Sequence, residues 1–420
     1  MVLFPKIKLQ ETNEVRQGIS PGADIGVVGA SAAGLFTALL LARAGRTVRL
    51  FERAERLDPA PRTLIVTDRI RHLLGASSQK CAVNQIHGFE LFTDGRAASI
   101  PLAYPDLVLE RSLLIRALAQ EAQSHGVQLQ FGRRFASLQG SRAGIEISFG
   151  AGSRTKSASY QRECCGALVG ADGAQSCVAR AAGWPRLTTV PLVQALVKLP
   201  SGMPSDTVRV WFIPDDTPYF YWLIPESSQQ GALGLIGIDG QRTRRCLERF
   251  MENRHFKALA FQGARIPLYE RWVPIERRIG RGRVYLVGDA AGQVKVTTLG
   301  GVVTGFRGAL GVTQSVLGNG ISPELRALRR ELDVHRLIRS SIHRFRQADY
   351  SRLVDWMNDG MRRSLSQVNR DEAARVLWHV CRNQPRLLLT GLRGLLASCL
   401  PNIENPSEGV SVVSPSVIQR

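Results

Sequence analysis

The sequence predicts an α/β fold in which an antiparallel sheet interrupts a parallel sheet and a helical region follows. Three observations favour this architecture. A strand, a glycine turn and a helix follow one another from Ile25, and turn residues separate strand-like runs across residues 185–278. Apolar residues then keep helical spacing from Gly301 to about Ser398. Alternating apolar and polar residues are typical of strands, whereas spacings of three and four are typical of helices.

The first unit of this fold is typical of dinucleotide-binding sites. Residues 25–28 predict a buried strand, a turn spans residues 29–34, and residues 35–44 predict a helix. A second strand over residues 47–51 ends at Glu52. The turn directs N–H groups and a positive helix end at a pyrophosphate, while the acid binds ribose hydroxyls. An ordinary α/β unit without a ligand is the alternative. The residues expected to contact the dinucleotide are Gly29, Ser31, Ala32, Ala33, Gly34, Glu52 and Arg53.

Composition narrows the class of protein further. A chain of 420 residues has room for two domains, or for one domain with a large insertion. The net charge of +20 favours anionic partners, but no nucleic-acid-binding motif accompanies it, so nucleic acid is not expected. The cysteines lack C-x-x-C spacing and the histidines form no ligand pair, so no metal site is expected. No apolar run is long enough to span a membrane and no signal-peptide core is present, which favours a cytoplasmic protein.

Two later turns have the same character as the first. A strand over residues 283–287 runs into Gly288-Asp289-Ala290-Ala291-Gly292, where the carboxylate can hold a sugar hydroxyl. A helix N-cap without a ligand is the alternative for this acid. Gly300 and Gly301 then open a helix whose N–H groups can face an anionic cofactor atom. A third turn at residues 170–174 permits tight bends near phosphates, although it is weak evidence alone.

The order of the three turns resembles that of FAD-dependent oxidoreductases of the para-hydroxybenzoate hydroxylase type, over roughly residues 23–320. Within that group the chain is most similar to the geranylgeranyl reductase family. Residues 288–298, GDAAGQVKVTT, and residues 220–225, similar to an aromatic Y-x-W-x-F-P box, carry this likeness. The resemblance implies an FAD-binding Rossmann-like domain with an inserted antiparallel β-sheet substrate domain and a C-terminal helical region.

The resemblance also implies roles for single residues, although it identifies no catalytic acid or base. Arg111 lies in the first turn of a helix expected over residues 107–122. Residues that match FAD contacts of the family are Thr63, Leu64, Val66, Arg111, Asp289, Gly300, Gly301 and Val302. Residues that match its isoprenoid pocket are Phe220, Tyr221, Trp222 and Pro225. Strand alternation separates Phe220 and Trp222 from Tyr221, and we expect the first face to border the substrate. Plain sheet core is the alternative.

The chain departs from the family's pattern at several positions. Ser31 replaces the middle glycine of the first turn, and Leu299 replaces a glycine beside the last one. Phe220 and Ile224 replace the usual tyrosine and phenylalanine of the box. The family's cysteine–glycine segment near the flavin is absent, and residues 62–66 occupy that region.

The expected function is that of an FAD-dependent oxidoreductase acting on a bulky apolar substrate. Reduced flavin would deliver hydride to an isoprenoid-type double bond. The alternatives are a flavin-dependent monooxygenase or halogenase, and a flavin-binding protein without turnover. The aromatic box also resembles one in halogenases, but Lys80 does not stand in the context of their catalytic lysine. No second nucleotide-binding unit is visible, so the expected reductant is transiently bound NAD(P)H or an electron-donor protein.

One segment near the end of the chain has a pattern typical of membrane contact. Leucines and two arginines gather at residues 385–397, which favours peripheral attachment to an anionic membrane surface at the inner membrane face. A packed terminal helix over the core is the alternative.

Changes in pattern along the chain also predict the domain boundaries. The expected units are a flexible segment 1–22, an FAD-binding domain 23–184 and 279–320, a substrate domain 185–278, a helical region 321–400 and a loose tail 401–420.

Overall fold

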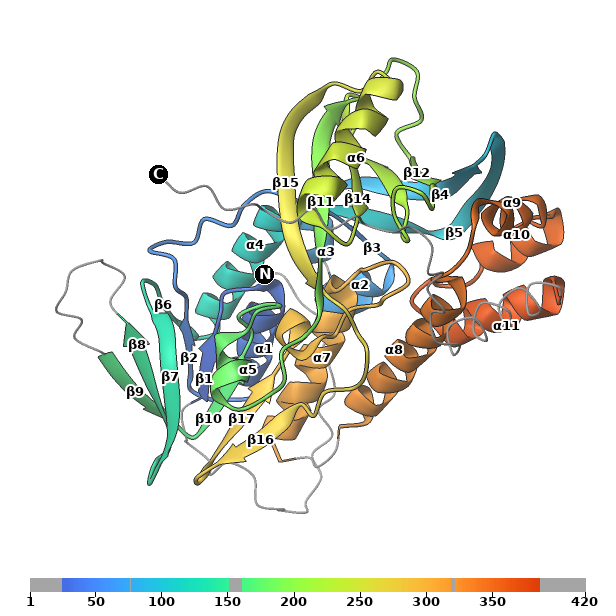
Figure 1. Ribbon diagram of the computed structural model, residues 1–420. Helices are drawn as coiled ribbons and strands as arrows, with labels where there is room; N and C mark the ends of the chain where they lie inside the picture. Colours follow the sequence, from blue (N-terminus) through green and yellow to red (C-terminus); the bar gives the residue numbers. More distant parts are fainter. Residues whose placement is uncertain (1–24, 76, 151–160, 319–321, 386–420) are drawn as a thin grey trace, which may run out of the picture.

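The computed structural model describes residues 25–75, 77–150, 161–318 and 322–385 (Figure 1). These residues form two large sheets, a small sheet and a group of C-terminal helices, which confirms the predicted α/β fold class. The expected lead-in 1–22 and tail 401–420 lie outside the described residues, as does segment 385–397 apart from its first residue.

A six-stranded sheet carries the three glycine turns. Its order is β16-β17-β10-β1-β2-β6, and every neighbouring pair except β16 with β17 is parallel. All residues of β1 and β10 are buried, as expected for parallel strands covered on both faces. Val28 is aligned with Gly170 and Gly170 with Leu286, so all three turns begin at the carboxyl ends of neighbouring strands. The strands are β1 (Ile25–Val28), β2 (Val48–Phe51), β6 (Gln128–Gln130), β10 (Ala167–Gly170), β16 (Glu276–Ile279) and β17 (Gly282–Leu286).

Helices and a small sheet cover this layer. Helix α1 (Ala32–Arg43) packs against α4 (Arg111–Ser124) and α7 (Val302–Val316). Phe36 of α1 meets Phe306 of α7 with ring centroids 4.8 Å apart. The small sheet packs on β2 through Phe149, whose ring centroid lies 4.6 Å from that of Phe51. Its strands are β7 (Arg134–Ser141), β8 (Gly144–Gly150) and β9 (Gln161–Cys165), and α5 (Cys177–Ala181) follows β10.

An eight-stranded sheet forms the second layer, in the order β15-β11-β14-β13-β12-β4-β5-β3. Strands β4 and β12 pair in parallel, and the other neighbours pair antiparallel. One face packs against α6 (Gly240–Asn253) through Leu247 and Phe250, while the opposite face borders a cavity. The strands are β3 (Thr63–Val66), β4 (Ala82–Thr93), β5 (Arg96–Glu110), β11 (Thr189–Lys198), β12 (Thr207–Trp211), β13 (Tyr221–Pro225), β14 (Gln230–Ile236) and β15 (Ala258–Pro267).

The C-terminal helices lie beside both layers (Figure 1). Helix α8 packs against α7, and α10 packs against β5. Ser322 caps α8 because its hydroxyl accepts a hydrogen bond from the Leu325 N–H, at 3.2 Å. No helix of the described part is long and apolar enough to cross a membrane. The remaining helices are α2 (Arg69–Leu74), α3 (Ser77–Lys80), the 3₁₀ turn η1 (Gly288–Ala291), α8 (Pro323–Ile342), α9 (Gln347–Asp355), α10 (Asp359–Ser366) and α11 (Ala373–Asn383).

Two expectations from the sequence need correction. The helix expected over residues 107–122 begins at Arg111, because Leu107–Glu110 complete strand β5 and Glu110 caps α4. Glu110 accepts a hydrogen bond from the Leu113 N–H at 2.9 Å. The antiparallel sheet is also not confined to residues 185–278, since β3, β4 and β5 precede that range and supply three of its strands.

Candidate active site

The first turn is compact because its glycines touch other backbone atoms. Gly29 has a φ of +106°, and a Cβ there would lie 2.6 Å from the Ala171 carbonyl oxygen. A Cβ on Gly34 would lie 2.2 Å from the Gly29 carbonyl oxygen. Ser31 accepts a hydrogen bond from the Gly34 N–H at 3.1 Å and donates one to the Ala171 carbonyl at 2.9 Å. The serine that replaces the usual glycine therefore caps α1 and joins the first turn to the one after β10.

Glu52 closes this turn from the end of β2. Its carboxylate accepts hydrogen bonds from the Ala30 N–H at 2.8 Å and from the Ala54 N–H at 3.0 Å. The acid therefore lies where a ribose would meet the turn. In the turn after β10, by contrast, the Asp172 carboxylate is already hydrogen-bonded to the backbone of its own turn. It accepts hydrogen bonds from the Cys177 and Val178 N–H groups at 2.7 and 3.2 Å.

Two arginines face Asp289 at the end of β17. Burial lowers the pKa of Arg62 and of Arg111, while the charge of Asp289 opposes this shift in each. Burial likewise raises the pKa of Asp289, and both arginines oppose that rise. The Arg111 guanidinium donates to the Ala60 carbonyl at 3.1 Å, whereas Arg62 Nε is buried without a hydrogen-bond partner. The cluster offers two cations and one carboxylate to a ligand with phosphates and hydroxyls.

The turn before α7 completes this group. A Cβ on Gly301, the N-cap of α7, would lie 3.2 Å from Asp289 Oδ1. The first N–H groups of α7 therefore point into the same region as Asp289 and carry the positive end of the helix dipole. Leu299 adopts a φ of +53° where the family has a glycine, and its side chain is buried beside Val294 and Trp222.

A cavity of about 740 Å³ adjoins these turns. The part of its lining that comes from the flavin-motif region consists of Ser31, Ala32, Ala33, Arg62, Thr63, Leu64, Val66, Arg111, Asp289, Gly300, Gly301 and Val302. Its far wall is mainly aliphatic and aromatic and includes Leu91, Ile100, Leu102, Leu192, Val208, Val210, Phe212, Phe220, Trp222, Ile224 and Ile236. The volume and the apolar lining suit an apolar molecule larger than a simple aromatic ring.

The aromatic box divides between two faces of β13, as alternation predicts. Phe220 and Trp222 line the cavity, with ring centroids 6.2 Å apart. Tyr221 points the other way, where it stacks on Phe250 at 4.3 Å and donates to Asp216 at 2.7 Å. Pro225 is also absent from the lining, because it lies at the end of β13 paired with Gly231. Tyr221 and Pro225 were expected to border the substrate pocket, but neither lines this cavity.

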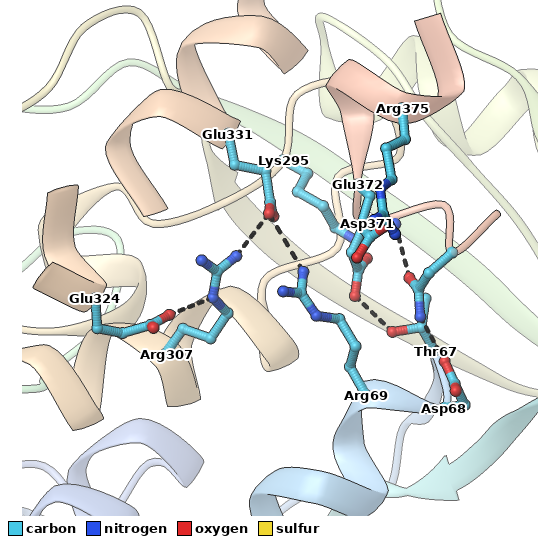
Figure 2. Close-up of polar contacts among 11 residues, drawn as sticks. Thr67, Asp68, Arg69, Lys295, Arg307, Glu324, Glu331, Asp371, Glu372 and Arg375 are labelled. Carbon is cyan, nitrogen blue, oxygen red and sulfur yellow. Dashed lines mark hydrogen bonds and ion pairs between the residues drawn. The ribbon is translucent and has the colours of Figure 1, made fainter. Parts of the chain in front are cut away.

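A buried ion pair lies beside the cavity and forms part of a group of polar contacts (Figure 2). Lys295 lines the cavity, and its ammonium bonds the carboxylate of Asp371, which precedes α11. Thr67 donates to the other carboxylate oxygen, at 2.5 Å. The two residues that precede Asp371 also form hydrogen bonds: Asn369 to Asp68, and Arg370 to Asp106 at 2.7 Å. These contacts fix the C-terminal helices to the two layers.

The structure thus brings most of the predicted FAD residues to one region. Gly29, Gly34, Glu52 and Arg53 are not part of the cavity lining, and Arg53 is exposed beyond the tip of β2. Sequence reasoning missed Arg62 and the cavity residues of β4 and β5. For Arg62 the only signal was its position directly before the expected loop at Thr63. The glycine contacts, the unpartnered Arg62 Nε and the open end of α7 together fit FAD.

A family model described as an FAD binding domain matches residues 22–313. The chain belongs to this FAD-binding family. The flavoprotein is 28% identical over 304 residues to digeranylgeranylglycerophospholipid reductase 2 of Methanothermobacter thermautotrophicus. The aligned segment covers 66% of this chain and 74% of that protein. It is an FAD-dependent oxidoreductase.

Solved structures share the flavoprotein's fold. A geranylgeranyl bacteriochlorophyll reductase-like protein from Thermoplasma acidophilum has a TM-score of 0.72 at 16% identity, covering 89% of this chain and 99% of its own. A flavin-dependent halogenase has a TM-score of 0.61 at 13% identity, covering 88% and 78%. The p-nitrophenol 4-monooxygenase of Pseudomonas putida has a TM-score of 0.57 at 18% identity, covering 88% and 97%.

Proposed function

We propose that this flavoprotein reduces carbon–carbon double bonds of a long apolar substrate of the isoprenoid type. The observation that carries the proposal is the apolar wall of the cavity, which adjoins the turns that fit FAD. A small flat aromatic substrate would contact only part of this aliphatic surface, whereas an isoprenoid chain would contact most of it. The name of the methanogen relative, an isoprenoid-lipid reductase, supports the same substrate class.

The residues around the turns have distinct tasks in this reaction. Bound FAD, when reduced, supplies hydride. Glu52 and Asp289 accept hydrogen bonds from sugar hydroxyls, while Arg62 and Arg111 balance negative charge on the dinucleotide. The N–H groups at the start of α7 favour negative charge beside Gly301. Phe220 and Trp222 bind the chain and keep water away from the reacting carbon atoms.

We infer that the electrons come from NAD(P)H bound transiently or from a donor protein. The first turn and Glu52 serve the adenosine half of FAD, and the sequence offers no second unit of this kind. We also propose that an anionic membrane surface supplies the apolar substrate, which is supported by the net charge of +20.

The test is an anaerobic one. The FAD-loaded protein is reduced and mixed with geranylgeranyl compounds of different headgroups in the absence of oxygen. Return of the oxidised flavin spectrum, together with loss of a double bond in the product's mass, is the expected result. A flavin that stays reduced until oxygen is admitted, followed by gain of one oxygen atom in the substrate's mass, would instead identify a monooxygenase.

The halogenase alternative lacks its central residue in this geometry. Lys80 ends the short helix α3, is exposed and does not line the cavity. Lys295 does line the cavity, but its ammonium is bound to Asp371 and so is not available as a nucleophile. The departures Ser31 and Leu299, which kept a protein without turnover under consideration, both have structural roles in the turn and the cavity.

A further inference from the structure

Helix α8 carries a buried arginine into the cavity. The Arg339 side chain lines the cavity although the residue is only 9% exposed. One turn earlier on the same helix, His335 contacts the Thr297 hydroxyl through Nδ1, at 2.8 Å. Arg339 and His335 are four residues apart, about one turn of α8, and so lie on the same side of the helix.

The immediate partners of Arg339 are neutral. One terminal nitrogen donates to the Pro218 carbonyl at 2.9 Å, and the other lies 3.2 Å from His343 Nδ1. The guanidinium carbon lies 3.9 Å from the ring centroid of Tyr219. Burial, together with the neighbouring arginines, lowers the pKa of His343, which favours a neutral ring. Burial is also the main influence on Arg339 itself, whose pKa it lowers.

Two other cations of the cavity wall have carboxylate partners. Lys295 is paired with Asp371, and Arg370 with Asp106. Within the described residues, no carboxylate forms an ion pair with Arg339, and none contributes to the shift of its pKa. A buried charge without a counter-charge is unfavourable, so such a cation is expected to be matched by an anion from elsewhere.

We propose that Arg339 binds an anionic headgroup, a phosphate or a carboxylate, at the end of the apolar substrate chain. This inference rests on the proposed function. The arginine retains donors beyond the two already used, and a planar guanidinium suits either anion. Apolar side chains such as Phe212 and Ile342 share the cavity wall with it, so an anion attached to an apolar chain fits better than a free ion. Fixing the headgroup at α8 also determines which double bond reaches the flavin turn.

Binding without turnover tests the assignment. FAD-loaded oxidised protein is titrated in a calorimeter with geranylgeranyl phosphate, geranylgeranoic acid, geranylgeraniol and inorganic phosphate. We expect the two chain-linked anions to bind roughly tenfold to a hundredfold more tightly than the alcohol, as hydrogen bonds to a charged group contribute. Inorganic phosphate alone is expected to bind far more weakly than either.

Three variants sharpen this test. Arg339→Gln should abolish the preference for the anion, Arg339→Lys should keep part of it, and the exposed Arg336→Gln, with the same loss of charge, should keep all of it. Arg339→Gln should not lower the melting temperature of the ligand-free protein, because it removes an unmatched buried charge. A structural role would lower it.

Equal binding of alcohol and anions by the wild type would overturn the assignment, and this comparison needs no variant. Equal affinity for inorganic phosphate and the chain-linked anions would also overturn it, in favour of a free-ion site. Failure of the proposed function would be a different result: tight anion-dependent binding followed by no alkene reduction under anaerobic conditions.

Discussion

Lys295 and Asp371 form a buried ion pair that joins the flavin-motif loop to the start of α11. The two residues are 4% and 0% exposed, and the neighbouring ties of Asn369 and Arg370 flank the pair. The pair therefore ties the loop that leads to Gly300 to the start of α11 (Figure 2).

Breaking this pair should be costly. Asp371→Asn or Lys295→Met leaves one buried charge unmatched and should lower the free energy of unfolding by about 3–5 kcal/mol. The double variant Lys295→Met/Asp371→Leu should recover most of that loss. Urea unfolding measures all three. The exposed pair Arg244–Glu248 is the control, since Arg244→Ala should change stability by less than about 1 kcal/mol. Additive single losses would show that the pair is not coupled.

His335 should make stability depend on pH. Burial, and then the charge of Lys295, lowers the pKa of His335 to about 4 in the folded protein. The unfolded chain, with a histidine pKa of about 6.5, binds the proton more readily. Stability is therefore full above about pH 6.5 and falls as pH drops toward 4. His335→Gln should flatten this slope in pH-dependent melting curves, whereas the exposed His87→Gln should not. An unchanged slope in His335→Gln would refute the assignment.

Asp289 and Glu52 should contribute to FAD affinity. Each carboxylate is placed to accept a hydrogen bond from a sugar hydroxyl, and a charged hydrogen bond contributes about 1.5–3 kcal/mol. Asp289→Asn and Glu52→Gln should weaken FAD binding roughly tenfold to a hundredfold, measured by flavin fluorescence. Glu270→Ala, at an exposed position, is the control. If neither carboxylate variant loses affinity, the dinucleotide binds elsewhere.

The two faces of β13 should separate substrate binding from folding. Trp222→Ala removes cavity surface and should weaken binding of a C20 substrate by about 1.5–3 kcal/mol while FAD stays bound. Tyr221→Phe removes the hydrogen bond to Asp216 and should lower stability by about 1 kcal/mol with no effect on substrate. Calorimetry and thermal melting distinguish them. The opposite assignment of effects would contradict the cavity described here.

Membrane attachment can be measured by vesicle flotation. The protein should float with vesicles that contain acidic lipid, and salt should release it. Deletion of residues 385–400 from a protein that still holds FAD should reduce flotation. Vesicles of neutral lipid are the control. A protein that stays in the soluble fraction at low salt, even with acidic vesicles, would exclude this proposal.

Local patterns predicted the first unit well because its parts are consecutive in sequence. The strand at Ile25, its turn and Glu52 need only neighbours along the chain to be placed. The β4–β5 hairpin was missed, because register shifts near Ile86 and proline at position 101 interrupt its alternation. The roles of Arg62 and Arg339 could not be predicted either, because each arginine is surrounded by residues that are distant from it in sequence.

The parallel pairing of β4 with β12 has a consequence for synthesis of the chain. Strand β4 gains its hairpin partner β5 at once, but its other edge stays open until Thr207–Trp211 has left the ribosome. An open strand edge is a template for pairing with another chain. The nascent polypeptide therefore passes through a long interval in which it is prone to aggregate, and chaperone supply should limit its yield.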